Sequence, residues 1–188
     1  MRTQAVRRRS PRLAVLAALG LLVAGCSSPK EMDVCPRVAV VGDAASLTRF
    51  RPGPGRDILD IDFQATMTDV RAACDYPDKK AKRREVVVQV APDLVFGRGA
   101  ANTDRKAQAT YFVSVVRTGE ILTKQEFVAA VDFVGNRSRV FFNDPEPPIT
   151  IDIPLTYKGA EYEYEVLLGL QLTEEELEEN RKWRGLSR

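Results

Sequence analysis

Alternation of apolar and polar residues in two segments near the carboxyl end limits the folds open to this chain. Between 162 and 172 the even positions are Tyr, Tyr, Val, Leu, Leu and Leu, while Glu161, Glu163, Glu165 and Gln171 occupy odd positions. Between 149 and 155 the odd positions are Ile, Ile, Ile and Leu. A period of two places each set on one face of a strand. Both segments are therefore predicted as half-buried antiparallel strands.

The same kind of pattern extends back to position 35. Further strands are predicted at 37–42, 59–76, 84–96, 109–118, 121–133 and 137–143. Within 59–76 the apolar phase moves from odd to even positions, which predicts a bulge near Thr68-Asp69. Thr118-Gly119 has the composition of a tight hairpin turn. About eight strands without intervening helices predict an all-β, immunoglobulin-like antiparallel β-sandwich over 35–172, with a closed barrel as the alternative.

Residues 173–188 carry the signals of one short helix and a tail. Thr173 is a favourable N-cap, and Glu176 three residues later completes a capping box. Acidic residues at 174–176 and basic residues at 181, 182 and 184 match the helix dipole.

The amino-terminal 25 residues have the composition of an export signal. Five arginines, at positions 2, 7, 8, 9 and 12, precede an apolar run over 13–24 that ends in Gly25-Cys26-Ser27. A membrane-spanning helix needs about 20 apolar residues, so this run is too short for one. A basic region, a short apolar core and small residues at the cut predict a secretory signal peptide over 1–25.

The sequence Leu22-Val23-Ala24-Gly25-Cys26 resembles the lipobox of bacterial lipoproteins. That resemblance implies diacylglycerol on the Cys26 thiol, cleavage before Cys26, and acylation of the new amine. Residues 26–34 would then form a tether between the lipid and the domain, facing the periplasm. By the same resemblance, Ser27 favours the outer membrane over the inner membrane.

Weaker motifs extend the resemblance into the domain. These are Cys35-Pro36-Arg37-Val38, Gly42-Asp43-Ala44-Ala45 and Gly169-Leu170-Gln171-Leu172-Thr173. With them the chain resembles uncharacterised small envelope lipoproteins of alphaproteobacteria. This resemblance implies an envelope location and no particular activity.

Removal of the signal peptide changes both the charge and the cysteine argument. Five of the 28 basic residues and none of the 26 acidic ones lie in 1–25, which leaves 23 against 26 and a net charge of −3. A slightly acidic domain gives no reason to expect nucleic acid as a partner. Cys35 and Cys74 remain beside the lipidated cysteine, and export to an oxidising compartment favours a disulfide between them. Two free thiols or a redox pair are the alternatives, although no Cys-x-x-Cys spacing is present.

The sequence predicts no catalytic residue, no metal site and no cofactor other than the covalent lipid. The absence of histidine from the sequence removes the Ser-His-Asp and Cys-His arrangements and histidine-ligated zinc. The carboxylate pairs Asp60/Asp62 and Glu161/Glu163 are spaced as neighbours on the solvated face of a strand. The oxygen-rich turns 102–104 and 143–146 lack the graded spacing of a calcium loop.

Two basic segments are the remaining candidates for binding. The first is a predicted hairpin tip that contains Lys79, Lys80, Lys82, Arg83 and Arg84, and the second is the loop 49–56, in which Phe50 is expected to be exposed. The leading hypothesis is a non-enzymatic binding or assembly module for another envelope protein, which presents loops or a sheet edge. Direct contact of the basic loops with the cell wall or lipopolysaccharide is the alternative. An enzyme is the second alternative.

Overall fold

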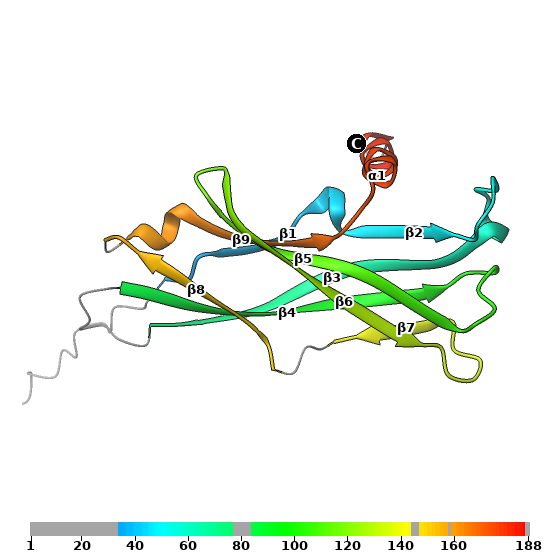
Figure 1. The fold of residues 1–188 in the computed structure, drawn as a ribbon, viewed down its shortest axis with the longest axis horizontal. Coiled ribbons are helices and arrows are strands. Elements are labelled where there is room, and N and C mark those ends of the chain that lie inside the picture. Colours follow the sequence, from blue (N-terminus) through cyan, green and yellow to red (C-terminus); the bar gives the residue numbers. More distant parts are fainter. Residues whose placement is uncertain (1–33, 77–83, 144–146, 158, 187–188) are drawn as a thin grey trace, which may run out of the picture. The chain divides into compact units, whose positions relative to one another are not determined.

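Two β-sheets packed face to face form the body of the protein (Figure 1). One sheet has the strand order β1-β9-β5-β6, and the other has the order β2-β3-β4, with both β7 and β8 pairing with β4. The strands are β1 (Arg37–Val40), β2 (Ser46–Phe50), β3 (Ile61–Asp75), β4 (Arg84–Arg98), β5 (Lys106–Arg117), β6 (Glu120–Asp132), β7 (Arg139–Phe142), β8 (Ile149–Leu155) and β9 (Tyr164–Leu170). The predicted all-β sandwich is confirmed, with two separate sheets in place of a closed one.

The computed structural model describes residues 34–76, 84–143, 147–157 and 159–186. The predicted signal peptide and Cys26 lie outside the described residues, as do Lys79, Lys80, Lys82 and Arg83. No helix in the described residues is long and apolar enough to cross a membrane.

The core lies between the sheets and is formed by the inward faces of the long strands. It contains Phe63, Ala65 and Met67 of β3, Val86, Val88, Val90, Leu94 and Phe96 of β4, Tyr111, Val113 and Val115 of β5, and Val166, Leu168 and Leu170 of β9. Each fully buried valine or leucine side chain contributes about 1.5–3 kcal/mol of transfer free energy. Because alternate residues of these strands are buried, the sequence pattern determines which face of each sheet packs against the core.

Two local features of the strands match the sequence expectation. The β3–β4 register shifts between Met67 and Asp69, where a bulge was predicted. The β5–β6 hairpin turns at Thr118 and Gly119, whose φ angles are 47° and 88°. Positive φ at both central residues is typical of the tight turn that suits two twisted antiparallel strands.

Three features of the sheets were not predicted. Strand β2 lies in a segment without alternation, and it includes Arg49 and Phe50, the first two residues of the predicted basic loop 49–56. The pairing of β1 with β9 is parallel, unlike the other pairs in the described residues. Tyr162 was expected on the inward face of the last strand, but it lies in the short helix η3 (Ala160–Glu163) and is 71% exposed.

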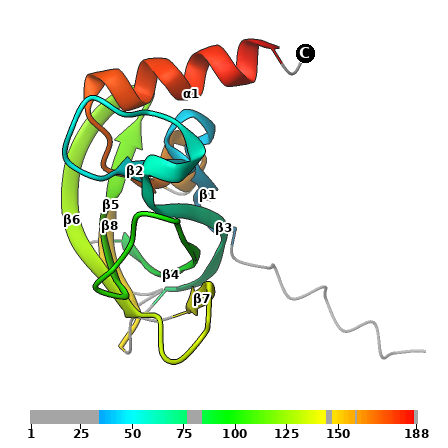
Figure 2. The same ribbon diagram turned by 90° about the vertical axis from the view of Figure 1, so that its right-hand side faces the viewer.

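The chain ends in α1 (Glu174–Leu186), which packs against β2 and the short helix η1 (Gly42–Ala44) (Figure 2). The predicted capping box is present, since Thr173 N donates to Glu176 Oε2 and Glu176 N donates to Thr173 Oγ1. The Asn180 side-chain amide donates to the carbonyls of Asp43 and Ser46, which attaches the helix to the start of β2.

Candidate functional site

The described chain begins beside a disulfide bond at one end of the sandwich. Cys35 and Cys74 are bonded, with Cα atoms 5.8 Å apart, as the sequence predicted. The Tyr76 hydroxyl donates a hydrogen bond to the Val34 carbonyl. We call this end of the sandwich the entry end. The disulfide and the hydrogen bond attach the first described residues to the end of β3 and to the residue that follows it.

Strand β3 runs from the entry end to the opposite end of the sandwich, which we call the far end (Figure 1). Thirteen residue steps separate Cys74 from Ile61, so the strand spans roughly 40 Å at the usual rise of an antiparallel strand. The β2–β3 loop, residues 51–60, lies directly before Ile61 and therefore at the far end.

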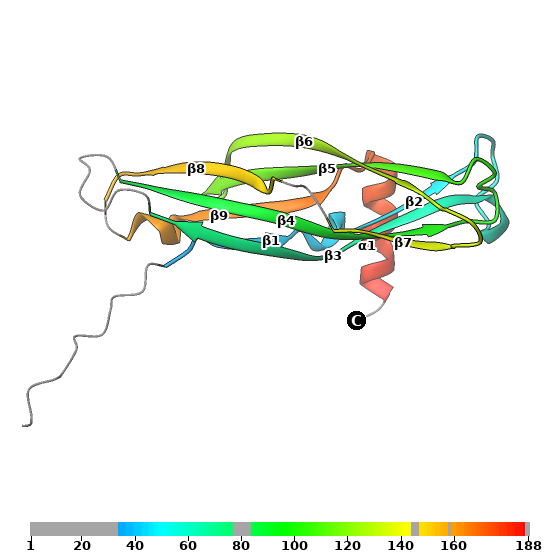
Figure 3. The same ribbon diagram turned by 90° about the horizontal axis from the view of Figure 1, so that it is seen from below.

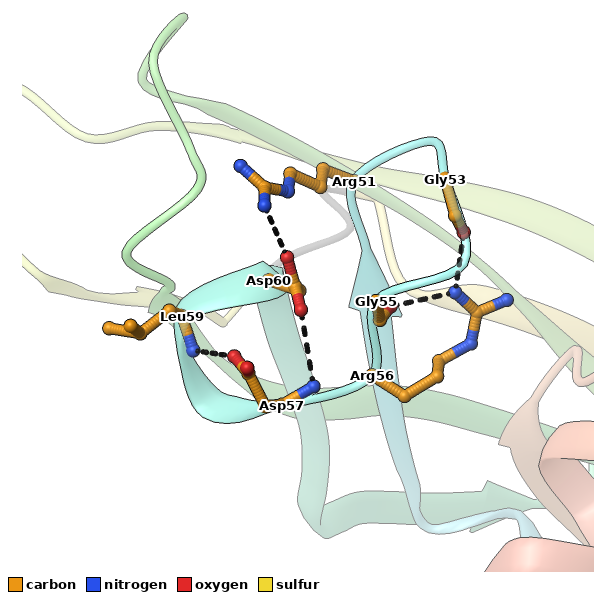
Figure 4. A network of polar contacts seen from close by, with 7 residues as sticks. All are labelled: Arg51, Gly53, Gly55, Arg56, Asp57, Leu59 and Asp60. Carbon is orange, nitrogen blue, oxygen red and sulfur yellow. Dashed lines mark hydrogen bonds and ion pairs between the residues drawn. The ribbon is translucent and has the colours of Figure 1, made fainter.

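The β2–β3 loop is organised by its own polar groups (Figure 4). It ends in the short helix η2 (Ile58–Asp60), which Asp57 caps: Leu59 N donates to Asp57 Oδ1 at 2.7 Å. In return, Asp57 N donates to Asp60 Oδ2 at 3.3 Å. This reciprocal arrangement satisfies two amide donors that the helix start would otherwise leave without partners.

Asp60 is the central residue of the loop network. It is only 5% exposed, and its Oδ1 lies 2.6 Å from Arg51 Nη2. The Arg51 amide also donates to the Asp60 carbonyl at 2.9 Å. A Cβ at Gly55 would lie 2.2 Å from Asp60 Oδ2, so only glycine allows the backbone to approach this carboxylate. The two ends of the loop are thus held together by an ion pair whose carboxylate is buried and whose arginine is exposed.

The arginines of the predicted basic loop 49–56 all have partners within the protein. Arg56 donates to the carbonyls of Gly53 and Gly55, and its guanidinium lies 5.3 Å from the centroid of the Phe50 ring. Phe50 is consequently half-buried, whereas the sequence analysis expected it to be exposed. Arg49 forms an ion pair with Glu176 of α1 at 2.7 Å. The contacts of these arginines therefore stabilise the conformation of the loop.

Two large apolar side chains are exposed on this rigid loop. Ile58 is 77% exposed and Leu59 is 67% exposed. Leu59 was predicted to begin a strand over 59–76, because it shares the odd-numbered apolar phase of Ile61 and Phe63. The strand begins only at Ile61. Asp57, two residues before Leu59, is a favourable N-cap, and it is the sequence signal that could have predicted the short helix before the strand. Sequence reasoning thus missed the apolar pair.

The remaining predicted residues are dispersed. Arg84 is exposed at the start of β4. Asp60 and Asp62 do not form a solvated pair, because Asp60 is buried against Arg51 and Asp62 Oδ1 accepts from Asn102 Nδ2 at 2.9 Å. Glu163 accepts two hydrogen bonds from Arg117, which raise the pKa of Arg117 above its ordinary value.

Among the described residues, no group of three or more Cys, Asp or Glu side chains is arranged to hold a metal ion. A scan against protein-family models, a search of curated proteins and a search of solved structures each found no match to the chain.

Proposed function

We propose that this protein is a lipid-anchored envelope lipoprotein that acts as a non-enzymatic binding module for another envelope protein. The lipid on Cys26 holds it at a membrane facing the periplasm, with the outer membrane favoured. Ile58 and Leu59 at the far end are the contact residues. The observation that carries the proposal is the exposure of both side chains on a loop that its own polar contacts hold in place.

Rigidity of the loop is the first argument for binding. The Asp57 cap, the Arg51–Asp60 ion pair and the Arg56 hydrogen bonds constrain the backbone before any partner arrives. A constrained loop loses little conformational entropy on association, so more of the contact energy appears as affinity. Burial of Ile58 and Leu59 against a partner would remove their apolar surface from water, which favours association.

The position of the anchor is the second argument. Cys26 precedes the disulfide residue Cys35 by nine positions, so the proposed tether joins the domain at its entry end. Ile58 and Leu59 lie beyond the other end of β3. The combination of diacylglycerol and an amide-linked acyl chain exceeds the single chain that gives only reversible membrane binding. The described chain thus begins at the entry end, whereas the proposed contact residues lie at the far end.

The loop 49–56 gives little support to direct contact with cell-wall or lipopolysaccharide anions. Arg49, Arg51 and Arg56 are each engaged with a carboxylate or a carbonyl of the protein itself. An anion would have to displace these partners, which offsets much of the gain from a new ion pair. We therefore favour an apolar contact with a protein.

Site-specific photo-crosslinking in intact cells tests this function. A photoreactive amino acid at Leu59 of the full-length protein is expected to form one discrete adduct with an envelope protein. The same amino acid at Tyr162, which is as exposed but lies in η3, is the matched control and is expected to give none. Absence of the Leu59 adduct, or equal adducts from both positions, would overturn the assignment of the far end as the contact site.

A further inference from the structure

Strand β6 is the longest edge strand in the described part of the chain. It has 13 residues and is hydrogen-bonded to β5 alone, and it runs along the outer margin of its sheet (Figure 3). Four shorter edge strands have features that usually prevent edge-to-edge pairing. Strands β1 and β7 have four residues each, β2 has five and contacts α1, and β8 contains Pro154.

One half of β6 has no such protection. The half next to the hairpin contains the charged residues Lys124 and Glu126, and its register with β5 shifts. The following five residues, Phe127 to Val131, carry no charge and no proline. Val128 points away from the core and is 56% exposed. Such a segment is well suited to pair with another strand.

The backbone groups that face the open edge can be identified. Phe133 N donates to Arg105 O at 2.8 Å, so the Arg105–Phe133 pair is of the hydrogen-bonded kind. Hydrogen-bonded and non-hydrogen-bonded pairs alternate along an antiparallel ladder. Odd-numbered residues of β6 below 133 therefore point their N–H and C=O groups toward β5, up to the register shift near the hairpin. Lys124, Glu126, Val128 and Ala130 therefore point both groups toward the open edge. Asp132 follows the same alternation, but its carbonyl already accepts from Val134 N at 3.1 Å.

We propose that this edge is occupied by β6 of a second copy of the chain, antiparallel and centred on Val128. In this register Val128 lies opposite Val128 of the second copy, and Glu126 lies opposite Ala130. Lys124 lies opposite Asp132 at both ends of the pairing. The two copies thereby join their four-stranded sheets into one sheet of eight strands.

Charge complementarity selects this register. Lys124 and Asp132 share the outer face of the sheet. Within one copy, Lys124 Nζ donates to Gln171 Oε1 at 2.7 Å and lies 3.4 Å from Glu126 Oε1, so a contact with Asp132 of the second copy exchanges these exposed partners for another carboxylate. Opposite charges directly across a strand pair stabilise it, and like charges destabilise it. A shift of two residues in one direction places Glu126 opposite Asp132 twice. The opposite shift places Lys124 opposite Ala130 and removes both ion pairs.

Cysteine crosslinking of the full-length protein in its membrane tests the pairing. A residue on the two-fold axis meets its own copy at a Cα separation of about 5.5 Å, which a disulfide can bridge. Val128→Cys is therefore expected to give a covalent dimer of this chain when copper phenanthroline is added. Ala130→Cys is the matched control, because its two copies would lie about 14 Å apart, and it is expected to stay monomeric.

A second variant tests the register itself. Glu126→Cys together with Ala130→Cys brings two different cysteines opposite each other and is expected to restore the covalent dimer. Similar dimer yields from Val128→Cys and Ala130→Cys would indicate random collision and would overturn the proposal. No dimer from Val128→Cys, or its crosslinking to a different protein, would overturn it as well. The binding loop at the far end lies outside β6, so failure here is distinguishable from failure of the Leu59 adduct.

Discussion

At Gly55, one carbon atom is enough to disturb the loop that presents the apolar pair. Gly55→Ala places a Cβ 2.2 Å from Asp60 Oδ2, so the carboxylate must leave Arg51 or the loop must open. We expect a loss of about 1–3 kcal/mol in the free energy of unfolding, which denaturant titration measures. The same variant is expected to speed hydrogen exchange at the Leu59 amide, because its acceptor Asp57 would move.

Gly97→Ala is the control for this substitution. A Cβ at Gly97 would meet no atom within 4 Å, so we expect an unchanged or slightly higher stability. If both alanine variants had the same stability, the Gly55–Asp60 approach would not be what constrains the loop.

Ionisation of the buried Tyr111 is expected to destabilise the folded state at alkaline pH. The Tyr111 side chain is buried and stacks on Phe127 with ring centroids 5.5 Å apart, and burial raises the pKa of Tyr111 to about 12. The unfolded chain ionises this phenol near pH 10, while the folded chain keeps it neutral. The stabilisation that the neutral Tyr111 side chain gives the folded state is complete below pH 10. As pH rises from 10 to 12, the free energy of unfolding falls by about 1.4 kcal/mol per pH unit.

Comparison with Tyr111→Phe isolates this contribution from other groups that titrate at high pH. We expect the difference in unfolding free energy between the wild-type protein and the variant to change only above pH 10. A difference that stayed constant from pH 8 to 12 would show that Tyr111 ionises equally in both states.

At the scale of single elements, the sequence predicts structure where side chains alternate and misses it where they do not. Strands β8 and β9 and the helix α1 follow from periodicity and capping residues that act locally. Strand β2 buries only Leu47 fully, so its five residues carry no period to detect. The loop before β3 was misjudged because charge in a sequence does not show which partner neutralises it. Arg51 and Asp60 are nine residues apart, and only the turn between them brings them together.

Removal of the disulfide is expected to lower the stability of the fold. Cys35 and Cys74 are separated by 39 positions, and closing such a loop contributes about 4 kcal/mol in the chain-entropy description. The double variant Cys35→Ala/Cys74→Ala is expected to lower the free energy of unfolding by about this amount. Denaturant titration of the oxidised protein and the variant checks it. A difference below about 1 kcal/mol would show that the bond does not restrict the unfolded chain as that description requires.

At the scale of the whole molecule, the domain has two ends with different chemistry. The entry end carries the disulfide and the Tyr76–Val34 hydrogen bond, and the far end carries exposed apolar residues on a constrained loop. The sequence predicted the bonded cysteines, because only one pairing was possible. It did not predict that β3 would separate them from Ile58 and Leu59, because strand order and sheet membership depend on long-range pairing. The proposed function rests on this difference between the two ends together with an anchor at Cys26.

The intact mass of the mature protein extracted from membranes tests the proposed anchor. The chain is expected to begin at Cys26 and to carry diacylglycerol and one further acyl chain, while Cys26→Ser is either released from the membrane fraction or left as the uncleaved precursor. A membrane-bound chain without lipid, or normal processing and lipid labelling of Cys26→Ser, would contradict it.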